Sequence, residues 1–406
     1  MTKLPNAPRT IAFYLPQFHA VPENDSWWGA GFTEWTNVRK AKPLFEGHDH
    51  PRVPVGLGYY DLADPEPVMR EQARSAAASG IDGFCFYVYW FDGARLLERP
   101  VDWYSTHGPD FPFCVSWANE SWTRRWDGKD HEVLMPQTYR RGFAADIFFD
   151  FLPYFRSPAY MRHEGKPVFV VHRVDQIPQA ADVADEWRRL ALESGLGGIH
   201  LVASETKPGL TPAQFGFDAI VEFPPVGSNT LGAALVRPVE DLAREFSGRL
   251  LSYGRLAKTF MERRAPTYVR YPGVTPGWDN TARRGDRATV YVGSDPETYR
   301  LWLSSARARE SAARGDKGFV FVNAWNEWAE GAYLEPDSTW GERFALATRW
   351  DAVSDLQPSM ALASGRWSLS QVRSIAILTL GSGVSWVRHI RNTLASLTRR
   401  LKVLRR

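Results

Sequence analysis

Cysteine is scarce in this sequence, which contains only Cys85 and Cys114 among 406 residues. Two cysteines exclude a disulfide framework and agree with a reducing compartment. No run of about 18 uncharged apolar residues occurs, so an ordinary transmembrane helix is not expected. The N-terminal stretch MTKLPNAPRTIAFYLPQF also lacks an apolar run long enough for a secretory signal. We therefore expect a cytoplasmic protein.

Acidic residues are missing from residues 359–406, which carry nine Lys and Arg. The whole chain has 49 Lys and Arg against 46 Asp and Glu, so the remainder is mildly acidic. A body of that charge does not indicate a nucleic-acid-binding protein.

Cofactor and metal motifs are also missing. No Gly-rich dinucleotide or phosphate-loop fingerprint follows the first expected strand, no DxD motif is present to hold a metal–nucleotide, and no His/Cys/Asp spacing suggests zinc. The sequence therefore predicts neither a cofactor nor a metal.

Short apolar runs alternate with helical patterns along the chain. Runs without strict alternation are typical of strands that are covered on both faces. We expect eight strands, at Thr10–Tyr14, Gly83–Tyr89, Phe113–Trp117, Pro167–Val171, His200–Ser204, Ala219–Phe223, Thr267–Arg270 and Gly318–Asn323. Proline at the start or glycine at the end delimits helices, of which we expect three at 64–80, 182–195 and 295–315. Eight strands with intervening helices favour an α/β fold, a (β/α)8 barrel, over a doubly wound open sheet.

Tryptophan is abundant, with 17 residues, and many of them follow the expected strands. The loops after barrel strands carry the chemistry of barrel enzymes. Amides, carboxylates and aromatic faces together are typical of a carbohydrate site. Expected at this rim are Gln17, His19, Tyr89, Trp90, Trp117, Asn119, Glu120, Trp122, His172, Arg173, Glu205, Glu222, Trp278, Asp279, Asn280, Trp325 and Asn326.

Glu327 and Glu330 follow the last expected strand and are three residues apart. In a helical turn this spacing places both carboxylates on one face. Two close carboxylates do not both ionise easily, and glycoside cleavage needs such a pair. Glutamates that complement the dipole at the start of a helix would give the same pattern.

Several long motifs make the sequence similar to a known family. They are YLPQFH at 14–19, ENDSWWGAGFTEWTNV at 23–38, PVGLGYYDL at 54–62, YWFDGARLLERP at 89–100, SWANESWTRRWDG at 116–128 and PGWDNTARR at 276–284. With them, residues 10–345 resemble the WbsX-like glycosyltransferase family, also described as having a glycoside hydrolase family 99-like domain. The segment WNEWAEGAYLEPD at 325–337 is similar to the NEWxEG…EP signature of family 99 endo-α-mannosidases.

This resemblance implies a (β/α)8 barrel and a retaining mechanism that uses no metal. Carried over by motif, Glu327 is the base that deprotonates the sugar 2-hydroxyl, and Glu330 is the general acid/base. Tyr14, Asn323 and Glu335 in these motifs are further expected substrate contacts. Glu34 and Trp35, in a loop after the first strand, are expected either to contact sugar or to pack that loop. Val88 and His50 stand where relatives often have histidine and glutamine, so the substrate is not copied from them.

Two arginine pairs, Arg124–Arg125 and Arg283–Arg284, allow two interpretations. Guanidinium groups suit the phosphate of a sugar nucleotide or a lipid-linked glycan. Salt bridges to the acidic body are the other interpretation.

The expected function is that of a carbohydrate-active enzyme of surface-polysaccharide assembly, of the O-antigen or lipopolysaccharide type. It would use glycosidase or transglycosidase chemistry on a mannose-like glycan. Two alternatives stay open: a glycosyltransferase with an activated sugar donor, and a non-catalytic glycan-binding module. The expected partner is an oligo- or polysaccharide, lipid-linked in one version of the hypothesis.

The chain divides into an expected catalytic domain, residues 1–350, and a basic extension, residues 351–406. An apolar stripe with helical spacing runs through the extension, at Val387, Ile390, Leu394, Leu397, Leu401 and Leu404. Arginines and Lys402 surround the stripe, which predicts a helix that contacts an anionic inner-membrane surface from the cytoplasm. Packing against the barrel or a second chain, and disorder, are the alternatives.

Overall fold

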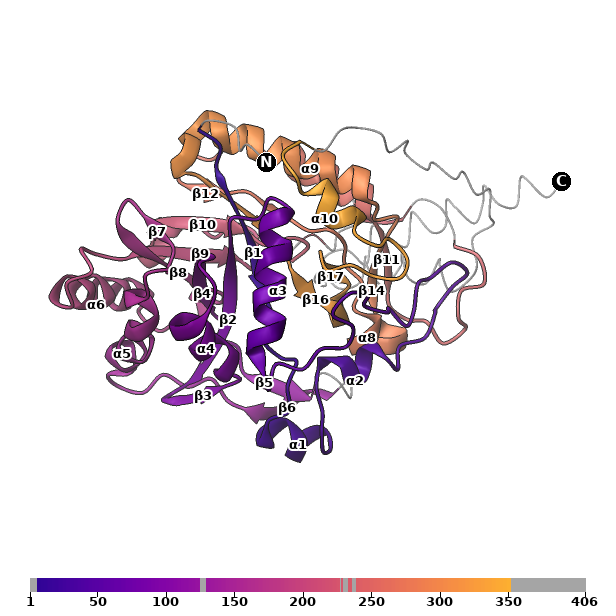
Figure 1. Ribbon diagram of the computed structural model, residues 1–406, viewed down its shortest axis with the longest axis horizontal. Coiled ribbons are helices and arrows are strands. Elements are labelled where there is room, and N and C mark those ends of the chain that lie inside the picture. The colour runs from indigo at the N-terminus through magenta and orange to yellow at the C-terminus, as the bar shows by residue number, and fades with distance from the viewer. Residues whose placement is uncertain (1–5, 125–128, 227, 229–232, 236–238, 352–406) are drawn as a thin grey trace, which may run out of the picture.

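The computed structural model describes residues 6–124, 129–226, 228, 233–235 and 239–351 (Figure 1). The predicted basic extension lies, from residue 352 onward, outside the described residues. In the described part of the chain, no helix is both long enough and apolar enough to cross a membrane.

The centre of the molecule is a parallel sheet that curls into a barrel. Its spatial order is β12-β10-β9-β8-β4-β2-β1-β15-β13. The bounds are β1 (Arg9–Tyr14), β2 (Gly83–Phe91), β4 (Phe113–Trp117), β8 (Lys166–Val171), β9 (His200–Glu205), β10 (Ala219–Glu222), β12 (Arg270–Tyr271), β13 (Gly273–Val274) and β15 (Phe319–Val322). These strands are nearly all fully buried, as apolar runs covered on both faces should be. The predicted (β/α)8 fold is confirmed.

The seventh strand of the barrel is divided at Pro272. Its first half, β12, pairs with β10, and its second half, β13, pairs with β15. The Pro272 carbonyl accepts a hydrogen bond of 2.9 Å from the Phe321 amide, so the chain bridges the two neighbours. The strand expected at Thr267–Arg270 was wrong in position, because the proline lacks an amide hydrogen and the pairing is shared between its two sides.

Helices cover the outside of the barrel (Figure 1). They are α3 (Pro65–Ala78), α4 (Arg99–His107), α5 (Phe143–Arg156), α6 (Ala180–Glu193), α7 (Tyr253–Met261), α9 (Pro296–Arg314) and α10 (Arg343–Ala347). The Asp295 carboxylate accepts from the Glu297 and Thr298 amides at the start of α9, and such caps satisfy amides that have no partner within the helix. The three helices predicted from proline and glycine, α3, α6 and α9, are confirmed.

Aromatic side chains fill the barrel interior. The ring of Phe13 on β1 contacts Tyr87, Phe223 and Phe321, with ring centroids 5.1 to 5.5 Å apart. Cys85 and Cys114 are register partners on β2 and β4 and are buried. The interior is therefore a packed core and not a pore through the barrel.

Short elements gather around the carboxyl ends of the strands, with α1, β5 and β6 at the bottom of Figure 1. They are α1 (Pro22–Trp28), α2 (Glu34–Val38), α8 (Thr281–Arg284), the hairpin of β5 (Trp122–Arg124) and β6 (Lys129–Met135), and the hairpin of β16 (Asn326–Glu327) and β17 (Ala332–Tyr333). The remaining strands are β3 (Ala94–Leu96), β7 (Arg162–His163), β11 (Arg249–Ser252) and β14 (Thr289–Val292).

Candidate functional site

A pocket of about 420 Å³ opens at the carboxyl ends of the barrel strands. The second half of β2 and the loops after the seven other strands contribute to its lining. These residues are Leu15, Gln17, Tyr87, Tyr89, Ala118, Glu120, His172, Arg173, Thr206, Phe223, Trp278, Asn280, Glu327 and Glu330. A site built from every strand end is where barrel enzymes place their catalytic groups.

Arg283 joins three carboxylates in and beside this pocket. Its Nη1 lies 2.6 Å from Glu330 Oε1, and its Nη2 lies 3.1 Å from Glu327 Oε2 and 3.0 Å from Glu34 Oε1. Glu327 ends β16 and Glu330 ends the 3-10 helix Trp328–Glu330, so one short turn presents both side chains to the pocket. Because one guanidinium bridges them, the two carboxyl groups lie within the roughly 10 Å that allows a pair to flank one glycosidic bond.

The charge balance of the pair is set by burial and by these neighbours. Burial raises the pKa of Glu327 well above its usual range; Arg283 lowers this pKa, and the carboxylates of Glu330 and Glu34 raise it further. The pocket without ligand therefore favours a proton on Glu327, while the closest contact of the guanidinium is with Glu330.

Aromatic side chains line the rest of the pocket, at Trp28, Phe32, Tyr89, Trp122 and Trp278. The Tyr89 hydroxyl accepts a hydrogen bond of 2.8 Å from Gln17 Nε2. The Trp122 ring packs edge-on against Trp27, Tyr89 and Phe91, which fixes its plane. Flat aromatic faces beside amides and carboxylates can stack on a sugar ring while polar groups bind its hydroxyls.

The structure brings ten of the predicted site residues together in the pocket lining: Gln17, Tyr89, Glu120, Trp122, His172, Arg173, Trp278, Asn280, Glu327 and Glu330. The others do not line the pocket. Those residues are Tyr14, His19, Glu34, Trp35, Trp90, Trp117, Asn119, Glu205, Glu222, Asp279, Asn323, Trp325, Asn326 and Glu335, all buried. We do not propose direct substrate contacts for them.

Three of the four tryptophans behind the lining donate their indole N–H to a main-chain or acidic partner. Trp35 Nε1 donates to the Tyr60 carbonyl at 2.7 Å, Trp90 Nε1 to Asp150 at 2.6 Å and Trp117 Nε1 to the Trp90 carbonyl at 3.1 Å. The main chain of Trp325 bonds to Phe13 and Leu334. Their rings therefore pack in the core, although they lie close to strand ends in the sequence.

The polar residues behind the lining also have protein partners. Asn119 bonds to the Arg173 main chain and to Tyr139, Asn323 to the Pro224 carbonyl, and Asn326 to the Leu15 main chain. Glu222 is paired with Arg263 and Arg270. Burial lowers the pKa of His19.

Other lining residues were not singled out from the sequence: Asn24, Trp28, Phe32, Tyr87, Thr123, Leu134 and Val226. Asn24, Trp28 and Phe32 belong to the motif at 23–38, and this motif could have identified them as site residues. Tyr87 lies inside β2, where its side chain was expected to be core. Arg283 forms ion pairs, one of the two interpretations allowed for it.

Glu335 sits in a buried network directly behind the glutamates. Its carboxylate accepts hydrogen bonds from Tyr60 Oη at 2.9 Å, Gln72 Nε2 at 2.7 Å and Trp328 Nε1 at 2.7 Å, and Tyr14 Oη donates to Gln72. None of these donors carries a charge, and burial raises the pKa of Glu335 to about 7.

A raised carboxyl pKa makes the folded state bind more protons than the unfolded state, so stability should fall as the pH rises. The free energy of unfolding should fall by about 3 kcal/mol between pH values of about 4.5 and about 7, and should stay level above that. Urea unfolding of the protein and of Glu335→Gln, which cannot titrate there, measures it as a difference. Parallel pH profiles for the two proteins would contradict the role of Glu335.

One group of side chains brings metal-ligating atoms together among the described residues. Potential donor atoms of His48, His50 and Asp279 lie within 4.8 Å of one another. The same oxygen of Asp279 also accepts from Arg52 Nη2 at 3.2 Å, which places a positive charge where a cation would bind.

Comparisons with known proteins agree with the fold and give the family. Residues 10–348 match the model of the family described as Glycosyltransferase WbsX. The uncharacterized protein WxcX of Xanthomonas campestris pv. campestris is 45% identical over 345 residues, covering 84% of this chain and 49% of that protein. The chain thus spans about half the length of the curated relatives it matches.

Among solved structures, a glycoside hydrolase-like protein aligns with a TM-score of 0.53 and 14% identity, over 86% of this chain and 94% of that chain. A GH99 endo-α-mannosidase from Bacteroides thetaiotaomicron aligns with a TM-score of 0.49 and 16% identity, over 85% and 96%. At 14% identity, the similarity to the glycoside hydrolase-like protein supports the barrel fold alone. The match over residues 10–348, together with the 45% identical relative, shows that the chain belongs to the WbsX glycosyltransferase family.

Proposed function

We propose that the protein is a retaining glycosidase or transglycosidase that acts on a mannose-like glycan during surface-polysaccharide assembly. The observation that carries this proposal is the pair Glu327 and Glu330, bridged by one guanidinium in an aromatic-lined pocket at the carboxyl ends of the barrel strands. Membership of the WbsX family supports a carbohydrate-active enzyme.

In the proposed reaction, Glu327 accepts the proton of the sugar 2-hydroxyl. The 2-oxygen then attacks the anomeric carbon, the bond to the leaving oxygen breaks, and Glu330 donates its proton to that oxygen. In the second step Glu330 takes a proton from water or an acceptor hydroxyl, whose oxygen opens the 1,2-anhydro ring. The 2-oxygen recovers its proton from Glu327, so both glutamates return to their starting forms.

Substrate binding has to change the charge state of the pair. Glu330 needs a proton to act as an acid, yet its closest charged contact is Arg283 at 2.6 Å. Glu327 needs to be ionised to act as a base, yet its burial favours the protonated form. We propose that sugar hydroxyls replace the contact between Arg283 and Glu330. Glu330 then becomes protonated and Glu327 becomes ionised.

The test is the stereochemistry and the acceptor of the reaction. Mannose-containing oligosaccharides of defined linkage are incubated with the protein, and the anomeric configuration of the first product is followed by NMR. We expect retention, and with methanol present a methyl glycoside of the same configuration. An inverted product would exclude the 1,2-anhydro route, and no product from any α-mannoside would remove mannose-like glycans from the proposal.

A second candidate is transfer from an activated sugar donor. Arg173 and Arg284 line the pocket, and guanidinium groups suit phosphate. Release of a nucleoside diphosphate from a sugar nucleotide, with no cleavage of oligosaccharides, would favour this candidate. Binding of oligosaccharides without turnover of either substrate would favour a glycan-binding module.

The surroundings of the enzyme belong to the same proposal. We infer a cytoplasmic protein whose glycan is lipid-linked and whose basic stretch at 387–404 contacts the inner membrane, because the composition of that stretch suits an anionic surface.

A further inference from the structure

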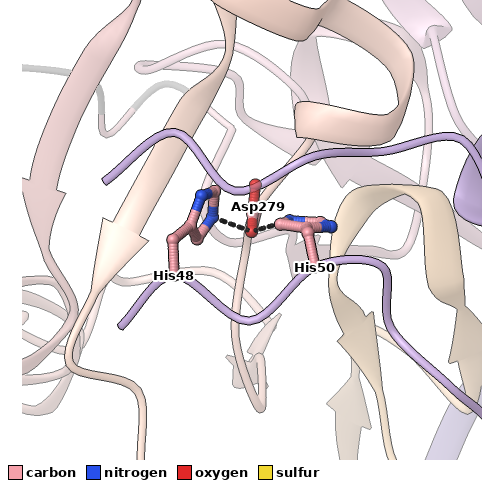
Figure 2. Close-up of side chains that lie close together, drawn as sticks. All are labelled: His48, His50 and Asp279. Atoms are coloured by element: carbon pink, nitrogen blue, oxygen red, sulfur yellow. Dashed lines mark hydrogen bonds and ion pairs between the residues drawn. The ribbon is translucent and has the colours of Figure 1, made fainter. Parts of the chain in front are cut away.

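Three side chains of one loop converge on a single oxygen of Asp279. His50 Nε2 lies 2.7 Å from Asp279 Oδ2, His48 Nε2 lies 2.8 Å and Arg52 Nη2 lies 3.2 Å from it. Figure 2 shows the two imidazole rings on opposite sides of the carboxylate. We call His48, His50, Arg52 and Asp279 the Asp279 cluster. All three donors come from residues 48–52, whereas Asp279 follows the seventh barrel strand.

The other atoms of Asp279 are bonded as well. Its Oδ1 accepts from the Thr281 amide at 3.0 Å and from Thr281 Oγ1 at 2.6 Å. Its own amide donates to the carbonyl of Glu330 at 2.6 Å. A Cβ placed on Gly331 would lie 2.9 Å from the Cβ of Asp279, so the two main chains are in close contact. The cluster therefore touches the main chain of a proposed catalytic residue.

A second connection runs through Arg52. Its Nη1 donates to the Tyr333 hydroxyl at 3.1 Å, and the Tyr333 ring stacks on Trp328 with 3.8 Å between centroids and 14° between planes. Trp328 lies between Glu327 and Glu330 in the chain. The cluster thus contacts the turn that carries both glutamates from two sides.

The hydrogen positions favour a hydrogen-bonded cluster over a metal site. The amide of Leu44 donates to His48 Nδ1 at 3.0 Å, so the neutral ring carries its proton on Nε2 and donates it to Asp279. A metal at Nε2 would need the lone pair there and would move the proton to Nδ1, against the Leu44 amide. The Arg52 guanidinium adds a positive charge at the shared oxygen.

We propose that the Asp279 cluster is a positioning device that fixes the main chain of Glu330 and thereby the catalytic pair. Its effect on turnover rests on the proposed function, but its effect on the main chain does not. The side chains of Trp278 and Asn280, which flank Asp279, line the pocket and are placed by the same contacts.

The test compares two changes at one position. His50→Gln retains an amide N–H that can reach Asp279 Oδ2, whereas His50→Leu does not. We expect His50→Leu to lower kcat by about 100-fold with KM within about twofold, since small displacements of catalytic groups have effects of that size. Hydrogen exchange at the Asp279 amide should become at least about tenfold faster. His50→Gln should restore both, and Asp49→Asn in the same loop is the matched control.

Each outcome decides one of the two proposals. Unchanged exchange in His50→Leu, or faster exchange with unchanged kcat, would overturn the positioning role. If the unaltered protein turns over no glycan, the proposed function fails, and the exchange contrast alone decides whether the cluster fixes the main chain. If His50→Leu does not fold, His50→Asn, whose amide is too short, replaces it. A rise in melting temperature with Zn²⁺ that His50→Leu abolishes would overturn the hydrogen-bonded assignment in favour of a metal site.

Discussion

Glu330→Gln should lower kcat on a glycan with an unactivated leaving group by about a thousandfold, the effect expected from the loss of a general acid. The glutamine keeps the shape of the side chain, but its amide is too weak an acid to protonate the departing oxygen. Glu327→Gln should lower kcat to a similar extent, because an amide cannot accept the proton of the 2-hydroxyl. Both are measured as initial rates of cleavage or transfer.

Substrates with a good leaving group separate the two roles. The aryl oxide of an aryl glycoside leaves without being protonated. With such a substrate the rate of the first step should therefore be largely restored in Glu330→Gln and not restored in Glu327→Gln. Glu193→Gln, an exposed glutamate on α6 paired with Arg189, serves as the matched control and should leave kcat unchanged. Equal recovery in both glutamine variants would contradict the assignment of the acid to Glu330.

Arg283→Gln should lower the free energy of unfolding by about 4 kcal/mol, because it leaves buried carboxylates without their cation. The Glu34 side chain is fully buried, and Glu327 is 8% exposed, so water screens neither of them well. Urea unfolding at pH 7 measures the loss. Arg189→Gln, which breaks an exposed pair on α6, should change stability by less than about 1 kcal/mol.

The loss in Arg283→Gln should also depend on pH. Arg283 is the group that lowers the pKa of Glu327, so its removal raises that pKa further above the unfolded value of about 4.3. The folded state then binds more protons than the unfolded state, and stability falls as the pH rises above about 4. Glu34→Gln combined with Arg283→Gln should recover about half of the loss. A loss independent of pH would mean that packing and not charge dominates.

Most strands could be predicted from the sequence because each appears as an apolar run of four to seven residues. The helices could be predicted because proline and glycine mark their ends. The seventh strand could not. Pro272 and Gly273 are normally breakers, and only the tertiary pairing of β12 with β10 and of β13 with β15 makes this segment a strand. The short β11–β14 pair, Arg249–Ser252 with Thr289–Val292, gave no distinct signal either.

The candidate site was predictable as a region but not residue by residue. Trp122 and Trp117 follow the same strand run in the sequence, yet only Trp122 faces the pocket and Trp117 points into the core. Which way a side chain points at a strand end depends on the local path of the chain, which spacing does not define. The contact of Glu34 with Arg283 joins distant segments, and no pattern in a single sequence pairs them.

The pairing of β1 with β15 determines when the barrel can close during synthesis of the chain. Arg9 pairs with Phe319 and Thr10 with Val320, so the first strand has no second neighbour until the ribosome has delivered the last strand of the barrel. At about 5–20 residues per second, this edge stays open for roughly 15–60 s. Glu327 and Glu330 emerge only after β15, so no nascent chain can present the proposed catalytic pair before the barrel is able to close. Chaperones that shield strand edges should therefore increase the yield of folded protein.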